Sequence, residues 1–267
     1  MNKRLLLILC GILLLAGGLF FAVKSVLATY APRAERTEAL APAAPTAPVT
    51  ARPANTPAPT SSTETPEPTA TPEPYESPVD FEALWEINPD IYAWLEIDNT
   101  SISYPILQSE EDDGFYLNHN SDKEYSANGS IYSESAYNGR DLSDPVTVLY
   151  GHHMKSGAMF GNLQMLFSDP TFFEENPVFR IYTPTATLEY GVFAAVPYPG
   201  DHILYYHDFN DDTVFEDFFD GIFKTRDLSA RFREEYAPEP GDKVVILSTC
   251  LIGYNKHRFL VMGTLLP

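Results

Sequence analysis

The chain has 267 residues, of which 37 are acidic and 17 are basic, and its formal net charge is −20. This charge argues against nucleic acid or anionic lipid as a partner of the folded part, because like charges repel. One of the two cysteines, Cys10, lies in an apolar N-terminal run, so the sequence predicts that Cys250 is a free thiol without a disulfide partner.

Residues 1–30 are predicted to form a basic cytoplasmic tip and a membrane anchor. Residues 5–23 are apolar and uncharged, and Lys3 and Arg4 precede them. As a helix, these 19 positions span roughly 28 Å, close to the thickness of a bilayer core. The basic tip favours a single pass with the N-terminus in the cytoplasm. A cleaved signal peptide is the alternative, since a possible cleavage site lies near residues 27–29.

Residues 31–78 are predicted to be a disordered linker outside the cell. The segment is rich in Pro, Ala and Thr and has almost no large apolar side chains, so it cannot bury enough surface to offset the entropy of ordering. Its 48 residues could reach on the order of 100 Å where they are extended. Such a linker suits a domain held away from a membrane within a cell wall, although a generic or glycosylated stalk would look similar.

Residues 79–267 are predicted to form one folded domain. Helical spacing of apolar residues predicts helices over 79–88, 160–167, 170–176 and 212–225, and 114–120 is a mixed turn or short helix. The predicted strands cover 92–97, 101–107, 129–132, 146–150, 178–182, 187–196, 243–250 and 258–265. Many short strands with a few peripheral helices favour a mostly β fold with a closed or nearly closed barrel. In the helix over 212–225, the stripe of Phe215, Phe218, Phe219 and Ile222 is predicted to face the core.

Cys250 is a candidate nucleophile at the end of the penultimate strand. A free cysteine is also among the most buried residue types, so a packed thiol is the competing interpretation. Arg258 begins the last strand, after a predicted polar loop, and a hairpin would bring it to the same rim as Cys250. A permanent cation there could stabilise an oxyanion, or it could form a surface salt bridge with one of the many acidic residues.

A cysteine nucleophile usually needs a histidine that moves protons for it. His152 and His153 follow the buried strand over 146–150, where side chains emerge at a barrel rim. The other four histidines, His119, His202, His207 and His257, lie in loops and are expected to be surface or capping residues. No metal site and no cofactor are predicted, since no His/Cys cluster has ligand spacing and no Gly-rich phosphate loop is present.

These motifs resemble those of the sortase family. Leu247-Ser248-Thr249-Cys250, followed by Arg258 on the next strand, is similar to the sortase signature, with Ile246 where the first Thr of that signature is commonest. The run from Tyr150 to Met154 resembles the sortase histidine loop, in which the residue directly after Gly is catalytic, and this selects His152 over His153. The segments that resemble class B sortases are 88–95, 103–106, 115–120, 129–132 and 154–161, together with the helix over 212–225.

The resemblance implies a membrane-anchored cysteine transpeptidase with its catalytic domain outside the cell. Cys250 would attack the C-terminal sorting signal of a secreted protein and form a thioacyl-enzyme, which an amino group of a peptidoglycan precursor would resolve. His152 would carry protons and Arg258 would stabilise the oxyanion. Tyr150, Ser248 and Thr249 are candidate residues for binding the sorting signal. No calcium-activation motif is found.

Two alternatives come from other functional classes. A secreted Cys–His peptidase or peptidoglycan hydrolase would normally place its cysteine before its histidine and at a helix N-terminus, whereas here His152 precedes Cys250 and the cysteine follows a strand. A non-catalytic wall-associated binding module would bury Cys250 as an inert thiol, so the rate of thiol alkylation distinguishes it from an enzyme.

Overall fold

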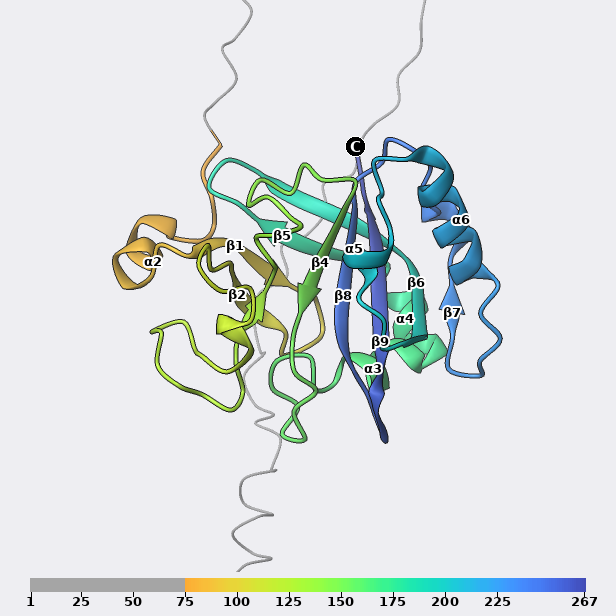
Figure 1. Cartoon of the computed structure of the whole chain (residues 1–267), viewed down its shortest axis with the longest axis horizontal. Helices are drawn as coiled ribbons and strands as arrows, with labels where there is room; N and C mark the ends of the chain where they lie inside the picture. The colour runs from red at the N-terminus through yellow and green to blue at the C-terminus, as the bar shows by residue number, and fades with distance from the viewer. Residues whose placement is uncertain (1–74) are drawn as a thin grey trace, which may run out of the picture. The chain divides into compact units, whose positions relative to one another are not determined.

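The computed structural model describes residues 75–267 (Figure 1). The predicted anchor, and all of the predicted linker before residue 75, lie outside this range. Within residues 75–267, no helix is both long and apolar enough to cross a membrane.

Short strands dominate the described domain. The helices and 3₁₀ turns are α2 (Phe81–Ile87), η1 (Phe115–Leu117), α3 (Leu163–Ser168), α4 (Pro170–Glu175), α5 (Ile203–Tyr206), α6 (Asp212–Phe223) and η2 (Glu234–Tyr236). The strands are β1 (Ile91–Glu96), β2 (Ser103–Leu107), β3 (Ile131–Tyr132), β4 (Val146–Tyr150), β5 (Val178–Tyr182), β6 (Thr187–Pro199), β7 (Arg231–Phe232), β8 (Val244–Leu251) and β9 (Tyr254–Leu265). All eight predicted strands are present, and α5 and β7 were not predicted.

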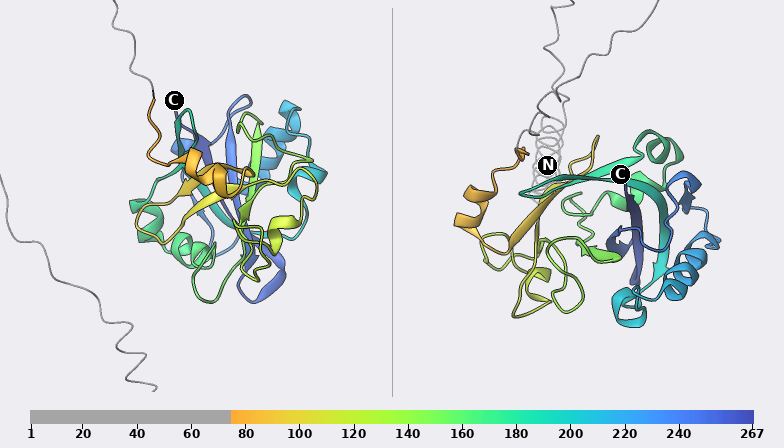
Figure 2. Two further views of the ribbon diagram at one scale, coloured as in Figure 1. Left: turned by 90° about the vertical axis from the view of Figure 1, so that its left-hand side faces the viewer. Right: turned by 90° about the horizontal axis from the view of Figure 1, so that it is seen from above.

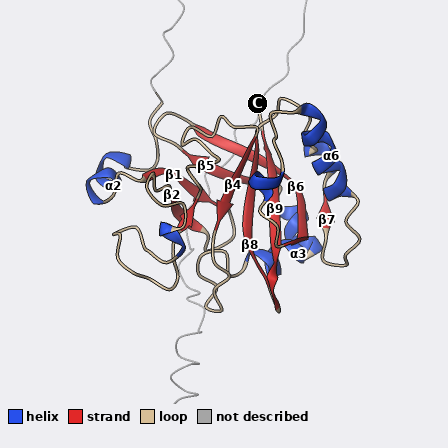
Figure 3. Ribbon diagram, viewed as in Figure 1, coloured by secondary structure: helices blue, strands red, loops and turns tan. Residues whose placement is uncertain are grey.

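Eight strands close into a barrel, which confirms the predicted mostly β fold. The neighbour order is β5-β1-β2-β3-β4-β8-β9-β6, and an additional pairing of β5 with β6 closes the ring. The short β7 pairs with β6 beyond β5, on the edge of β6 opposite β9. Most neighbouring pairs are antiparallel, but β2–β3 and β4–β8 are parallel. Seen from above, the strands run around a common interior (Figure 2, right). Figure 3, in the view of Figure 1, shows the helices at the periphery of the strands.

Alternating side chains on the strands build two apolar cores. Val245 and Leu247 of β8 point into the barrel, where they join residues from all eight barrel strands. Val244 and Ile246 of the same strand point outward and pack beneath α6. The predicted core face of α6 is confirmed, because its four apolar residues are at most 7% exposed and belong to this outer core.

The connection between β8 and β9 is shorter than the sequence suggested. The predicted polar loop between Cys250 and Arg258 is mostly strand, since β8 continues to Leu251 and β9 already begins at Tyr254. Gly253 has a φ of +81°, a left-handed conformation that glycine adopts without strain and that permits so tight a turn. Cys250 therefore stands inside a strand, with a register irregularity directly after it.

Candidate active site

The parallel pairing of β4 with β8 places His152 beside Cys250. Tyr150 lies opposite Ser248 in this pairing, and the Gly151 N–H donates to the Ser248 carbonyl at 3.1 Å. His152 lies two residues beyond Tyr150, just after the end of β4, and Cys250 lies two residues beyond Ser248 on β8, and both line a pocket of about 80 Å³. Gly151 is required at this approach, because a Cβ atom there would lie only 2.6 Å from side-chain atoms of two neighbouring residues.

Arg258 lies directly across the β8–β9 pair from Cys250. The two residues are register partners, and the Arg258 Nη1 atom lies 3.5 Å from the Cys250 Sγ atom. The thiol is free and half-buried, so it is neither sealed in the core nor fully in solvent. The alternative interpretation of Arg258, a surface salt bridge, does not hold, because no carboxylate within residues 75–267 pairs with it. Its guanidinium faces the pocket instead.

The two adjacent histidines have different surroundings. His152 lines the pocket, and its Nε2 atom lies 2.8 Å from the Leu117 carbonyl of η1. A carbonyl only accepts hydrogen bonds, so this contact places a proton on Nε2 and orients the ring. His153 does not line the pocket; it forms an isolated bridge with Met159, and its Nδ1 atom is buried without a partner.

The three predicted substrate-binding residues all line this pocket, but in different ways. Tyr150 and Ser248 lie on the outer face that also carries Cys250, and the Tyr150 hydroxyl is buried near the Glu134 carboxylate. Thr249 points the other way, since neighbouring strand residues alternate, and its side chain is only 1% exposed. Thr249 can therefore reach the pocket through its backbone and not through its hydroxyl.

Sequence reasoning missed several residues of this site. Leu117 and Tyr132 line the pocket, and a second cavity of about 70 Å³ adjoins it, lined by Tyr150, Ser248, Arg258, His202 and Ile203, with Gly200 and Asp201. His202 has the predicted capping role, because its Nδ1 atom accepts the Tyr205 N–H at the start of α5. No sequence signal links these residues, which come from elements and loops far apart in the chain.

Burial keeps the tyrosines of the site protonated. Burial, together with the nearby carboxylate of Glu134, raises the pKa of Tyr150 well above its usual value. Burial likewise raises the pKa of Tyr132 to about 12, with Glu134 adding to the effect and Arg258 opposing it. Both hydroxyls are therefore neutral at physiological pH, and each can donate a hydrogen bond to a ligand.

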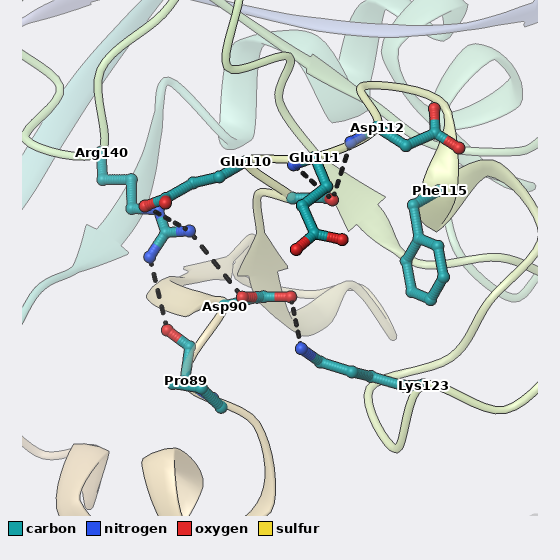
Figure 4. Close-up of a pocket in the computed structure, with 9 residues that line it drawn as sticks. Pro89, Asp90, Glu110, Glu111, Asp112, Phe115, Lys123 and Arg140 are labelled. Carbon is teal, nitrogen blue, oxygen red and sulfur yellow. Dashed lines mark hydrogen bonds and ion pairs between the residues drawn. The ribbon is translucent and has the colours of Figure 1, made fainter.

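A larger cavity of about 470 Å³, lined in part by Phe115 of η1, contains mainly charged side chains (Figure 4). Its centre is Asp90, which pairs with Lys123 at 2.8 Å and with Arg140 at 3.8 Å. Burial would raise the pKa of Asp90, but hydrogen bonds from Lys123 and Tyr116 outweigh it and lower the pKa. This cavity is lined by four carboxylates and two cations but by no thiol or histidine, so it is not the reacting site.

The small pocket thus combines three chemical groups. A thiol can act as a nucleophile, an imidazole can carry protons and a guanidinium can stabilise a developing oxyanion. Candidate metal ligands do not gather elsewhere in the described part of the chain, where no group of three or more His, Cys, Asp or Glu residues could hold an ion.

Comparison with known proteins agrees with this chemistry. Residues 95–266 match the sortase domain family. Sortase B of Listeria monocytogenes is 33% identical over 184 residues, covering 68% of this chain and 72% of that protein. The crystal structure of a B. anthracis sortase B has a TM-score of 0.60 at 31% identity, covering 70% of this chain and 83% of that one. A Staphylococcus aureus sortase B–substrate complex has a TM-score of 0.60 at 27% identity, covering 70% and 84%.

The family match covers more than half of the chain, and its relatives are sortases B. Within the matched region, Cys250, His152 of the histidine loop and Arg258 surround one pocket. The chain therefore belongs to the sortase family as a class B sortase, and it is a cysteine transpeptidase.

Proposed function

We propose that this transpeptidase cleaves the C-terminal sorting signal of secreted proteins and transfers them to an amino group of peptidoglycan. The observation that carries the proposal is the convergence of Cys250, His152 and Arg258 on one pocket. Family membership favours this chemistry over a Cys–His peptidase or peptidoglycan hydrolase, and over a non-catalytic wall module. A relative solved as a substrate complex supports a peptide substrate for this site.

In the first half-reaction, the Cys250 thiolate attacks the carbonyl carbon of the scissile bond, which is of the Thr–Gly or Thr–Asn type. The carbonyl electrons move to oxygen, and the Arg258 guanidinium stabilises this oxyanion. When the intermediate collapses, the C–N bond breaks and protonated His152 gives its proton to the leaving amine. The products are a thioester on Cys250 and the released C-terminal fragment.

In the second half-reaction, an uncharged amino group of a peptidoglycan precursor attacks the thioester carbon. A second oxyanion forms beside Arg258, and His152 accepts a proton from the attacking nitrogen. Collapse breaks the C–S bond, so the new amide leaves and the Cys250 thiolate is restored. Charge, protons and electrons balance over the two half-reactions without any further reactant.

The sorting signal would bind along the outer face of β4 and β8. Tyr150 lines both cavities of the groove, and its hydroxyl, which lies near the Glu134 carboxylate, would donate to a peptide carbonyl. The Ser248 side chain lies on the same face, and Thr249 would contribute its backbone. These three roles remain predictions from the resemblance, supported by the position of each residue at the pocket.

The N-terminal segment would tether this activity to the cell membrane. The proposal divides the chain into a cytoplasmic tip and anchor over 1–30, a linker over 31–78 and a catalytic domain over 79–267. It rests on the uncharged apolar run over 5–23 and on the Pro-rich composition that follows it. The catalytic domain would then act outside the cell, near its peptidoglycan acceptor.

The direct test is a scan of sorting-signal peptides against the purified domain, with mass spectrometry of the intact protein. We expect one peptide class to give a covalent adduct on Cys250 whose mass equals the N-terminal part of the peptide. We also expect an added amine to discharge this adduct as an amide. If the domain hydrolyses peptides equally with and without amine, the proposed transfer step is wrong.

The neighbouring histidines provide an internal comparison. His152→Ala is expected to lower kcat/KM by at least about a hundredfold, because the leaving amine loses its proton donor. His153→Ala is expected to stay within about fivefold of the native protein, since His153 lies outside the pocket. Steady-state cleavage of one fluorogenic peptide measures both. A larger loss for His153→Ala would transfer the proton-carrying role to that residue.

A further inference from the structure

A short segment between β6 and α6 forms a wall of the catalytic groove. Residues 200–206, which include α5, contribute His202 and Ile203 to the cavity of about 70 Å³. That cavity shares Tyr150, Ser248 and Arg258 with the pocket of Cys250 and His152. The two cavities are therefore neighbouring parts of one groove, in which His152 and His202 occupy different ends.

The segment is held in place by apolar and aromatic packing and by one polar contact with the loop after β3. Gly200 lies so close to β9 that a Cβ atom would come within 2.0 Å of the Lys256 carbonyl oxygen. Ile203 is buried in the outer core at 4% exposure. His202 Nε2 lies 2.7 Å from Glu134 Oε2, across 68 positions of sequence. Among the described residues, this is the one hydrogen bond or ion pair that joins segment 200–206 to the loop after β3.

Both nitrogens of His202 are occupied in this arrangement. The Tyr205 N–H donates to Nδ1 at 3.1 Å, so the ring proton lies on Nε2 and is donated to Glu134. The Glu134 side chain is 17% exposed and the His202 side chain is 34% exposed, so solvent only partly competes for this contact. Removal of the carboxylate would leave a half-buried N–H without its acceptor.

We propose that Glu134 is a positioning residue that fixes His202, and with it segment 200–206, against the outer face of β4 and β8. Which half of the bound peptide faces His202 is inferred from the proposed function. If His152 serves the leaving amine, then the acyl half of the donor peptide lies toward Arg258 and His202. The Glu134–His202 pair thus preforms the wall that receives the acyl-donor side of the sorting signal, without touching the reacting atoms.

Kinetics separate this role from a catalytic one. Glu134→Ala is expected to raise KM for the donor peptide roughly tenfold and to change kcat less than threefold, because binding must first order the loosened segment. Glu134→Gln keeps an acceptor for Nε2–H, so its KM is expected to stay within threefold of the native value. The matched control is Glu189→Ala, which breaks the surface pair with Arg180 at 2.9 Å and should change neither constant.

A second variant guards against a simple folding defect. His202→Phe keeps a ring but loses both hydrogen bonds, and it is expected to raise KM to a similar extent. The double variant of Glu134→Ala and His202→Phe should be no worse than either single variant, because both break the same contact. Additive effects of the two substitutions, or a KM unchanged in both single variants, would overturn the proposal.

Proteolysis tests the position of the segment independently of the reaction. Tyr205 and Tyr206 are 67% and 66% exposed, so chymotrypsin can cut there once the segment opens. Chymotrypsin should cut the Glu134→Ala variant at these tyrosines about tenfold faster than the native protein. Cleavage at Tyr125, which is 75% exposed, should be unchanged and serves as the reference. Equal cutting of segment 200–206 in both proteins would overturn the proposal. If the native protein processes no sorting peptide, the proposed function fails, and this readout still decides the role of Glu134.

Discussion

Replacement of Cys250 by alanine is expected to lower the turnover of a sorting peptide by at least about a thousandfold and to abolish the covalent adduct. The thiol is half-buried beside Arg258 and shares its pocket with His152, and no other cysteine lies within residues 75–267. Without sulfur, no atom of the pocket can form the thioester on which both half-reactions depend. Intact-protein mass and steady-state peptide cleavage measure the two effects.

The folded state provides the control for this variant. The substitution removes one half-buried atom at a barrel edge, so the thermal unfolding midpoint is expected to stay within a few degrees of the native value. Peptide binding, measured by fluorescence anisotropy, should also persist, because the walls of the groove are intact. Retained turnover in a folded Cys250→Ala protein would remove the thiol from the mechanism.

Replacement of Arg258 by lysine is expected to reduce kcat by about a hundredfold to a thousandfold, with a much smaller change in KM. Lysine preserves the positive charge but loses the planar fork of donors. The register of β9 places that fork across from Cys250, with Nη1 at 3.5 Å from the sulfur, where an oxyanion would develop. The rate of adduct formation in a single turnover reports this step directly.

Arg180→Lys provides the matched control for Arg258→Lys. Arg180 forms ion pairs with Asp98 and Glu189 on the far side of the barrel and lines neither cavity of the groove. Its conservative replacement is expected to leave both kcat and KM unchanged. Near-normal adduct formation in Arg258→Lys would show that the forked donor geometry of Arg258 is not needed to stabilise the oxyanion.

The strands and the main helix were predictable because their pattern is local. Val244 to Leu247 form an apolar run bounded by a turn, and both of their faces are buried in the structure, one in the barrel and one beneath α6. The aromatic stripe of α6 repeats at helical spacing and forms a core face. By contrast, α5 has four residues and β7 has two, which is too short for either period to appear.

The sequence by itself determined the order of the strands along the chain, the free thiol of the folded domain and the residue types that transpeptidation needs. Tertiary structure decided which of these residues meet. The parallel register of β4 and β8 brings His152 to Cys250, although 98 positions separate them, and leaves His153 outside the pocket. The alternation of side chains along β8 turns the Thr249 side chain into the barrel. A side-chain contact between distant segments joins Glu134 to His202. The spacing of apolar residues along the sequence indicates which face of a helix or strand is buried. Strand register and loop contacts depend instead on packing between segments far apart in sequence.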